Sequence, residues 1–370
     1  MSSIVRLVIG GAFALALLAA GPFVFLAPRA PQSLPPAKSV IDMHAHVAGL
    51  GHGCEHCFVS PDLLDSYKYK WYLRAFGTSA AEMADESDLI VAERLREHIR
   101  SSRWIRQAVL LALDGVINEH GLLDEHATQV FIPNDYVAGL AASHEEFLFG
   151  ASINPSRPNW RERLEQAKQD GAVLVKWIPS IMDIDPANHD LQPFYELLIA
   201  LDLPLLVHVG DENAFRHADN RLGDPERLIA PLEQGVTIIA AHIGTTGHNN
   251  GEENFDRLIP MLLNYPNLYT DISSLTQINK RGYLRRALAT AGVAERMVYG
   301  SDWPLQFFPL VWRWWHLGSA PFAELRYSAT LHNPFDRDIA LKAVLGVPQV
   351  VFTRTSEVLR LPQHLVEEVQ

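Results

Sequence analysis

The chain has 370 residues, of which 48% are hydrophobic, and its 31 basic and 43 acidic side chains give a net charge of −12. This length suits one barrel-sized domain or two domains of ordinary size. The acidic balance excludes nucleic acid as an expected partner, because binding to phosphates requires clustered lysines and arginines.

The chain begins with a segment that could enter a membrane. Residues 7–27 carry no charge and follow Arg6. At about 1.5 Å per residue, a helix over them would cross a bilayer core of about 30 Å. The best cleavage candidates are followed by Pro22 or preceded by Phe25, which favours an uncleaved anchor over a cleaved signal. We therefore predict contact with the membrane through this segment, and a membrane-anchored or exported location on the extracytoplasmic side.

A linker and a folded domain follow. Residues 28–38 contain four prolines and are typical of an extended linker. The predicted division is therefore residues 1–38, an anchor or signal with its linker, and residues 39–370, one globular domain. The two cysteines of the chain, Cys54 and Cys57, could form a local disulfide or remain free thiols. A structural zinc site is the weaker interpretation, because it needs four ligands and no second cysteine pair exists.

The first predicted strand ends in two histidines. It covers residues 40–47, with the sequence VIDMHAHV. Side chains two apart in a strand point the same way, so His44 and His46 present two imidazoles to one point. Such a pair suits a divalent transition metal. Two polar residues in a loop would give the same pattern, so the decision depends on further ligands later in the chain.

Strands and helices alternate through the rest of the domain. Residues 60–102 are predicted to be helical. Seven further apolar strands are predicted at residues 107–114, 147–154, 172–178, 204–209, 236–243, 268–272 and 297–300. Helices are predicted at residues 134–144, 160–169, 191–201, 225–234, 254–263 and 283–291. Short apolar strands of this kind belong to a parallel sheet covered on both faces, and eight such units predict an α/β fold, a closed (β/α)8 TIM barrel.

Polar residues stand at the C-terminal ends of the last five strands. They are Lys176, His208, His242, Asp271 and Asp302. Successive members are spaced roughly 30 residues apart, the length of one βα unit, so they should lie at the same height of the barrel. Closure of the barrel would then bring Asp302 beside the two histidines of the first strand. Because barrel enzymes carry their chemistry at this end, the spacing turns the His-Ala-His pattern into a strong metal signal.

Four motifs resemble the marks of one enzyme superfamily. They are Ile-Asp42-Met-His44-Ala-His46, Leu-Val-His208-Val-Gly, Ala-Ala-His242-Ile-Gly and Tyr-Gly-Ser-Asp302-Trp-Pro. Together they resemble the amidohydrolase superfamily, and Gly-Ser-Asp-Trp-Pro is similar to its amidohydrolase-related branch (amidohydrolase 2) of TIM-barrel hydrolases and decarboxylases. The resemblance covers most of the domain and is not specific for any substrate.

The resemblance implies a catalytic divalent metal, most often zinc, bound by His44, His46, His208 and Asp302. Asp302 would move the proton of a metal-activated water, and His242 would polarise the substrate carbonyl. One ion is favoured and two are possible. In relatives with two metals, a carboxylated lysine at the position of Lys176 bridges the ions, and the histidines at the positions of His208 and His242 bind the second one.

The implied activity is a metal-dependent hydrolase that attacks an amide, ester or lactone-type bond of a small molecule. A decarboxylase or hydratase, that is, a carbon–carbon or carbon–oxygen lyase, would use the same residues. A non-catalytic metal-binding domain is the third alternative. Lys176 and Trp177 are the expected substrate contacts. The sequence does not indicate an oligomeric state.

Four further polar residues have two interpretations each. Arg216 and Arg281 could grip a substrate carboxylate or lie solvated on the surface. Asp271 could hydrogen-bond a ligand histidine or serve the fold, and Asp114 has a similar place at the end of the second strand.

Overall fold

The computed structural model describes residues 27–362, and eight strands form one sheet at its centre. In chain order they are β1 (Val40–His46), β3 (Ile105–Leu111), β5 (Phe147–Ala151), β6 (Ala172–Trp177), β7 (Leu205–His208), β8 (Ile238–Ala241), β11 (Leu268–Asp271) and β12 (Met297–Val298). Every neighbouring pair is parallel, and the order in the sheet is the order in the chain. The predicted α/β barrel is confirmed.

The last strand returns to the first. The backbone N–H of Asp302 donates to the carbonyl of His44 at 2.8 Å, and that of His46 donates to the carbonyl of Trp303 at 3.0 Å. These bonds close the wall between β12 and β1. They also place the residues that follow β12 directly against the end of β1.

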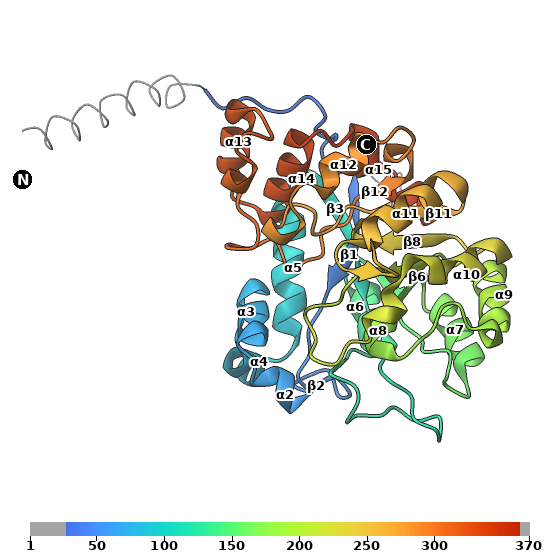
Figure 1. Ribbon diagram of the computed structural model, residues 1–370. Coiled ribbons are helices and arrows are strands. Elements are labelled where there is room, and N and C mark those ends of the chain that lie inside the picture. Colours follow the sequence, from blue (N-terminus) through green and yellow to red (C-terminus); the bar gives the residue numbers. More distant parts are fainter. Residues whose placement is uncertain (1–26, 363–370) are drawn as a thin grey trace, which may run out of the picture.

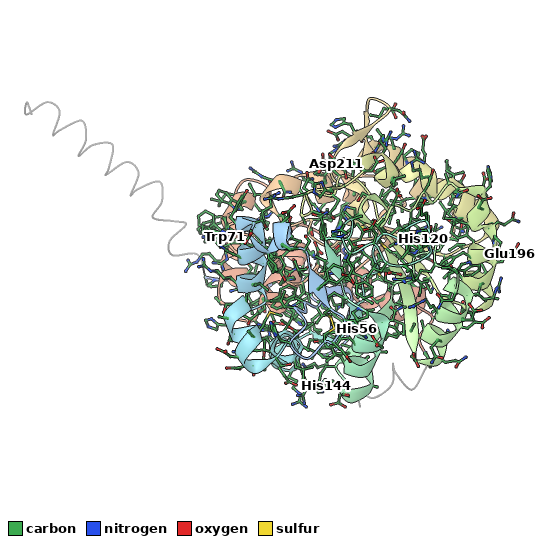
Figure 2. All side chains as sticks on the ribbon, turned by 90° about the horizontal axis from the view of Figure 1, so that it is seen from below. His56, Trp71, His120, His144, Glu196 and Asp211 are labelled. Atoms are coloured by element: carbon green, nitrogen blue, oxygen red, sulfur yellow. A yellow bond between two sulfur atoms is a disulfide. The ribbon has the colours of Figure 1, made fainter. Side chains whose placement is uncertain are left out.

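The barrel has an inner and an outer core because strand side chains alternate between the two faces of the wall. The interior is filled by a cluster that includes Ile41, Met43, Val109, Leu111, Leu148, Leu174, Leu206, Ile239 and Val298. The larger cluster lies between the wall and the helices. Side chains fill this space throughout the molecule (Figure 2). The strands are therefore apolar on both faces, as the sequence indicated.

Helices surround the barrel (Figure 1). Those between strands are α5 (Leu89–Ser101), α6 (Asn134–Ser143), α7 (Trp160–Gln169), α8 (Pro179–Met182), α9 (Gln192–Ala200), α10 (Ile229–Gln234), α11 (Asn254–Asn264) and α12 (Tyr283–Leu288). After the last strand follow α13 (Phe322–Ala329), α14 (Pro334–Val344), α15 (Gln349–Thr353) and α16 (Thr355–Val358). The residues Val358 and Leu359 join the inner cluster, so the end of the described chain covers one opening of the barrel.

The longest excursion between consecutive barrel strands runs from β1 to β3. It carries α2 (Pro61–Leu64), α3 (Tyr67–Ala75) and α4 (Ala80–Glu86), which lie side by side at the lower left of Figure 1. The excursion also contains β2 (Phe58–Val59). This strand pairs in antiparallel fashion with β4 (Val130–Phe131), which lies between β3 and β5 in the chain. This excursion confirms the predicted helical content of residues 60–102 and reaches over the C-terminal end of the barrel.

A tethered loop begins the excursion. The buried carboxylate of Asp88 accepts hydrogen bonds from four backbone N–H groups, those of Leu50, Gly51, His52 and Cys54. Cys54 and Cys57 form a disulfide within the same loop. The structure therefore selects the disulfide over the free thiols and over a zinc site.

One prediction is corrected. Between residues 27 and 362 the structure contains no helix that is both long and apolar enough to cross a membrane. This finding overturns the membrane-anchored or exported location, which we withdraw together with the predicted membrane contact. The segment that prompted the prediction, up to residue 26, lies outside the described residues. Apolar composition over one window is a condition for a membrane span and does not by itself establish one.

Candidate metal centre

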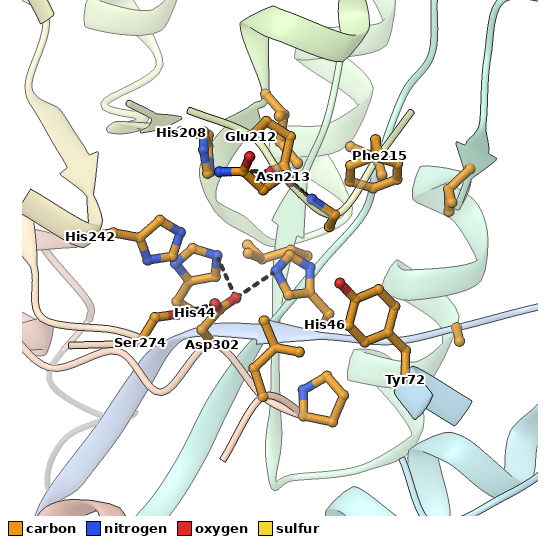
Figure 3. A pocket seen from close by; sticks show the side chains of 18 of the residues that line it. His44, His46, Tyr72, His208, Glu212, Asn213, Phe215, His242, Ser274 and Asp302 are labelled. Atoms are coloured by element: carbon orange, nitrogen blue, oxygen red, sulfur yellow. Dashed lines mark hydrogen bonds and ion pairs between the residues drawn. The ribbon is translucent and has the colours of Figure 1, made fainter. Parts of the chain in front are cut away.

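Three side chains at the C-terminal end of the barrel direct their ligand atoms toward one another (Figure 3). His44 and His46 come from the end of β1, and Asp302 follows β12. Asp302 Oδ1 lies 3.2 Å from His46 Nε2 and 3.7 Å from His44 Nε2. The ligand atoms of the three residues all lie within 4.8 Å of one another. The first and last strands thus meet as the spacing predicted.

An irregularity in β1 turns both histidines into the cavity. The pairing of β1 with β3 shifts register between Asp42 and Ala45. Within this interval, Met43 belongs to the cluster inside the barrel, and the next residue, His44, lines the cavity at the barrel mouth. His46, beyond the interval, lines the same cavity. Such a bulge re-aims side chains that strict alternation would send elsewhere.

Asp271, at the end of β11, fixes the imidazole of His44. Its Oδ2 accepts a hydrogen bond from His44 Nδ1 at 2.7 Å, so Nε2 of the neutral ring is left as an acceptor that faces Asp302. Burial, followed by the charge of Lys176, lowers the pKa of His44 to about 4. Of its two interpretations, Asp271 takes the one in which it orients a candidate ligand.

Asp302 is held in an uncommon backbone conformation, with φ of 63°. Its Oδ2 accepts a hydrogen bond from the Ser274 hydroxyl, and its Oδ1 faces the two histidines of β1. Burial alone would raise the pKa of Asp302, but the neighbouring imidazoles, with His242 first, hold this pKa well below its usual range. The carboxylate is therefore ionised at neutral pH.

His208, at the end of β7, faces the cavity with a free nitrogen. It is 7% exposed, and its Nε2 has no hydrogen-bond partner in the described part of the chain. Burial, followed by the charge of Lys176, lowers the pKa of His208 to about 3, so the ring is neutral. A buried ring nitrogen without a partner is costly unless a ligand occupies it. His208 lies outside the group of three, but it lines the same cavity, and its Nε2 is available to a ligand.

His242, directly after β8, is held in the tautomer that carries its proton on Nδ1. Ser273 Oγ donates to Asp271 Oδ1 and lies 2.7 Å from His242 Nδ1. Because the serine proton is used on Asp271, Nδ1 carries the proton and donates to Ser273. The Nε2 of His242 is then an acceptor, and burial lowers the pKa of the ring well below its usual value.

The two neighbours on β6 point in opposite directions. Lys176 is buried and faces the cavity, with its Nζ 3.3 Å from His44 Nε2. Trp177 is fully buried on the other side of the wall, where it packs on Phe194 and donates from Nε1 to the carbonyl of Ile153. The predicted substrate contact of Trp177 is therefore wrong, because adjacent strand residues face opposite sides.

These residues fit a divalent ion. In a tetrahedral site with bonds of about 2.0–2.2 Å, neighbouring ligand atoms lie about 3.3–3.6 Å apart. The two distances from Asp302 Oδ1, 3.2 and 3.7 Å, bracket this value. The unpartnered nitrogen of His208 offers a further ligand. A second group that could hold an ion, His44, His242 and Asp271, is already joined by its own hydrogen bonds.

The ligands lie in a cavity of about 280 Å³, a size suited to a small molecule. One side of the cavity carries the polar residues of β1, β6, β7 and β8. The other side is an apolar wall contributed mainly by the excursion after β1 and by β3 and β4, and its members include Val59, Leu63, Phe76, Leu113 and Ile132.

The sequence missed several residues of this cavity. Lining residues that it missed are Tyr72 of α3, Glu212 and Phe215 of the loop after β7, and Ser274 (Figure 3). Gln277 and Lys280 line the cavity as well. Arg216 and Arg281 are exposed and do not line it. The only signal for Lys280 was its place beside Arg281 in the turn after β11. Asp114 forms an ion pair with Arg157 at 2.5 Å, so its role is structural.

Residues 41–324 match the model of the family described as Amidohydrolase (Amidohydro_2). The chain belongs to the amidohydrolase family. This assignment confirms the resemblance seen in the four motifs. Members of the amidohydrolase family are metal-dependent hydrolases and decarboxylases. Among curated proteins, no sequence matches this amidohydrolase.

Solved structures share the fold at low identity. An uncharacterized TIM-barrel protein of Bordetella bronchiseptica is 18% identical, with 83% of this chain and 95% of that chain covered and a TM-score of 0.50. A probable 2-pyrone-4,6-dicarboxylic acid hydrolase from Acinetobacter baumannii is 15% identical over 89% and 98% of the chains, with a TM-score of 0.48. A 5-carboxyvanillate decarboxylase from Sphingomonas paucimobilis is 14% identical over 88% and 100%, with a TM-score of 0.48.

Proposed function

We propose that this amidohydrolase is a hydrolase that adds water to an amide, ester or lactone-type bond of a small molecule. It uses one divalent ion for this reaction, and zinc is the favoured ion. One observation carries the proposal: His44 Nε2, His46 Nε2 and the ionised Asp302 carboxylate converge on one point of the cavity at the barrel mouth. Imidazoles and carboxylates are the ligands of catalytic zinc sites, in which water or substrate takes a further position.

The proposed ligands are His44, His46, His208 and Asp302. A zinc ion held by them would act as a Lewis acid on a water molecule or a substrate oxygen. A single ion is favoured because the second group of candidate ligands is engaged in hydrogen bonds of its own.

The chain's own side chains would then move the protons. Asp302 accepts the proton of the attacking water and returns it to the leaving group. Lys176, the buried donor beside His44, hydrogen-bonds the oxygen that gains negative charge. His242 presents an acceptor, so the donor role that the sequence suggested for it requires its protonated form.

A lyase is the second candidate, and the apolar wall of the cavity favours it. A carboxylate placed against apolar side chains loses its hydration, which favours its departure as carbon dioxide. The same metal ligands would serve that reaction. Incorporation of ¹⁸O from labelled water indicates the hydrolase, and release of carbon dioxide without such incorporation indicates the lyase.

Metal content and turnover test the proposal together. The purified full-length chain should hold close to one divalent ion and convert members of a panel of esters, lactones, amides and carboxylic acids. Asp302→Asn should lower kcat/KM by about 10³-fold, because it removes the proton carrier. The exposed Asp190→Asn variant is the matched control. A chain without stoichiometric metal, or an Asp302→Asn variant with full activity, would refute the proposal. Bound metal without any turnover would point to the non-catalytic alternative.

A further inference from the structure

Lys280 is a buried cation without a partner. It ends the short turn η5 (Ile278–Lys280) after β11, is 9% exposed, and lines the cavity. Within residues 27–362, its Nζ makes no hydrogen bond, and no carboxylate oxygen lies within 4.0 Å of it. Asp302 and Glu212 attract it only through space. Burying an ammonium group in this way costs free energy unless an anion compensates for it.

The other buried lysines of the described chain show the contrast. Lys342 is paired with Asp338 at 2.6 Å and donates to the Gly300 carbonyl at 2.9 Å. Lys176 has the ring nitrogen of His44 at 3.3 Å. Lys176 also has a part in the proposed reaction, whereas Lys280 lines the cavity with neither such a contact nor such a part, so its partner is expected to come from the ligand.

A second donor without a partner stands beside Lys280. Gln277 is 4% exposed, lines the same cavity, and its Nε2 has no partner among the described residues. The two residues are held on one turn, because the backbone N–H of Lys280 donates to the Gln277 carbonyl at 3.1 Å. Two unsatisfied donors on one rigid turn form a place for a carboxylate, which accepts several hydrogen bonds at once.

The rest of the cavity requires the ligand to be largely apolar. The wall that includes Leu63, Phe76 and Ile132 has no cation to receive a second negative group. A molecule that satisfies both sides has one anionic end and one apolar body.

From these contacts we infer that the substrate of this site is a small amphipathic monoanion whose carboxylate binds Lys280 and Gln277 and whose apolar part lies against the wall. The inference deepens the proposed function and rests on it, since it concerns the same cavity. It assigns Lys280 as a specificity-determining residue, which selects the charged end of the substrate without taking part in proton transfer.

Binding of a ligand series tests the inference without turnover. The metal-loaded full-length chain is titrated calorimetrically with straight-chain carboxylates of four to eight carbons and with their primary amides. Carboxylates should bind more tightly than the amides, and each added methylene should lower Kd by up to about fourfold until the wall is covered. Lys280→Met should weaken the carboxylates by at least about tenfold and the amides by less than twofold.

Control variants separate the subsite from the metal and from the fold. Lys280→Arg should keep most of the carboxylate preference, and the exposed Lys168→Met should change nothing. Phe215→Ala, in a half-buried loop residue of the wall, should flatten the dependence on chain length. The effect of Lys280→Met should persist in metal-free protein, and its Tm should not fall, because the lysine has no partner to lose.

The outcomes are distinct from those of the hydrolase test. Equal binding of carboxylates by wild type and Lys280→Met, or an equal loss for the amides, overturns the subsite even where the enzyme remains active. Carboxylate binding that depends on Lys280 in a chain that turns over no substrate leaves the subsite standing and removes the proposed hydrolase.

Discussion

Four hydrogen-bond donors converge on the carboxylate of Asp271. They are His44 Nδ1, the backbone N–H groups of His242 and Ser273, and the Ser273 hydroxyl. The residue therefore sets the orientation of one imidazole and the tautomer of another. A group that orients ligands in this way controls metal affinity without contacting the metal.

Asp271→Asn should weaken metal binding by about 10–100-fold, because the amide no longer holds the His44 ring as a charged acceptor. Competition with a fluorescent chelator measures the change. Asp114→Asn is the matched control, since Asp114 follows β3 and pairs with Arg157 away from the ligands. An unchanged metal affinity in Asp271→Asn would contradict the role given to this carboxylate.

The loop after β1 depends on a single side chain for its shape. Asp88 is fully buried and satisfies four backbone N–H groups of residues 50–54, while Gly49 at the start of the loop lines the cavity. The loop packs so closely that a Cβ at Gly49 would lie 2.6 Å from Cys57 Sγ. The apolar side of the cavity is thus tied to the stability of this loop.

Asp88→Ala should lower the free energy of unfolding by about 2–4 kcal/mol, because it leaves several backbone donors without a charged acceptor. Urea denaturation measures the loss. The neighbouring exposed Asp85→Ala should change the unfolding free energy by less than about 0.5 kcal/mol. A stability equal to that of the wild type would show that water replaces the carboxylate at no cost.

A pH-dependent ion pair joins α5 to the start of β5. Glu146 accepts hydrogen bonds from Arg100 and, at 3.3 Å, from Arg96. Burial raises the pKa of Glu146, but its backbone hydrogen bond and the two arginines outweigh burial and lower this pKa below 4.5. A carboxyl with a lowered folded-state pKa stabilises the protein above its unfolded pKa and loses that contribution as pH falls through the folded pKa.

Glu146→Gln should therefore cost about 1 kcal/mol of unfolding free energy at pH 7, and the difference from wild type should shrink as pH falls below 4.5. Denaturation at several pH values measures this. The exposed Glu145→Gln is the control. A difference that grows on acidification would reverse the sign of the linkage.

The whole barrel should gain stability from the metal, because the proposed ligands are assembled only in the folded chain. With free ion at 100 times its Kd, the gain is about 2.7 kcal/mol. For a chain of this size, chelation should therefore lower Tm by roughly 5 °C. Asp302→Asn, which lacks one ligand, should show a much smaller shift on chelation. Equal melting with and without metal would argue against a site built by the fold.

How much of the molecule could be predicted depended on periodicity. The eight strands and the meeting of His44, His46 and Asp302 followed from apolar runs with a polar residue at regular intervals. The expected substrate contact of Trp177 fails because adjacent residues of β6 face opposite sides of the wall, so only Lys176 reaches the cavity. Lys280 lies in a turn, where no repeating pattern tells which side chain points inward. The sequence also left the state of Cys54 and Cys57 open, because only the folded loop shows that their sulfur atoms meet.

The closure of β12 onto β1 has a consequence for how the protein is made. His44 emerges among the first residues of the domain during synthesis, and Asp302 emerges only after β12. Until that strand docks, the barrel stays open and the proposed metal site lacks its carboxylate ligand. Contacts between such distant parts of a chain form slowly and late in folding. The proposed metal would therefore be captured after translation has passed the last strand, and bound metal would mark molecules that are both complete and folded.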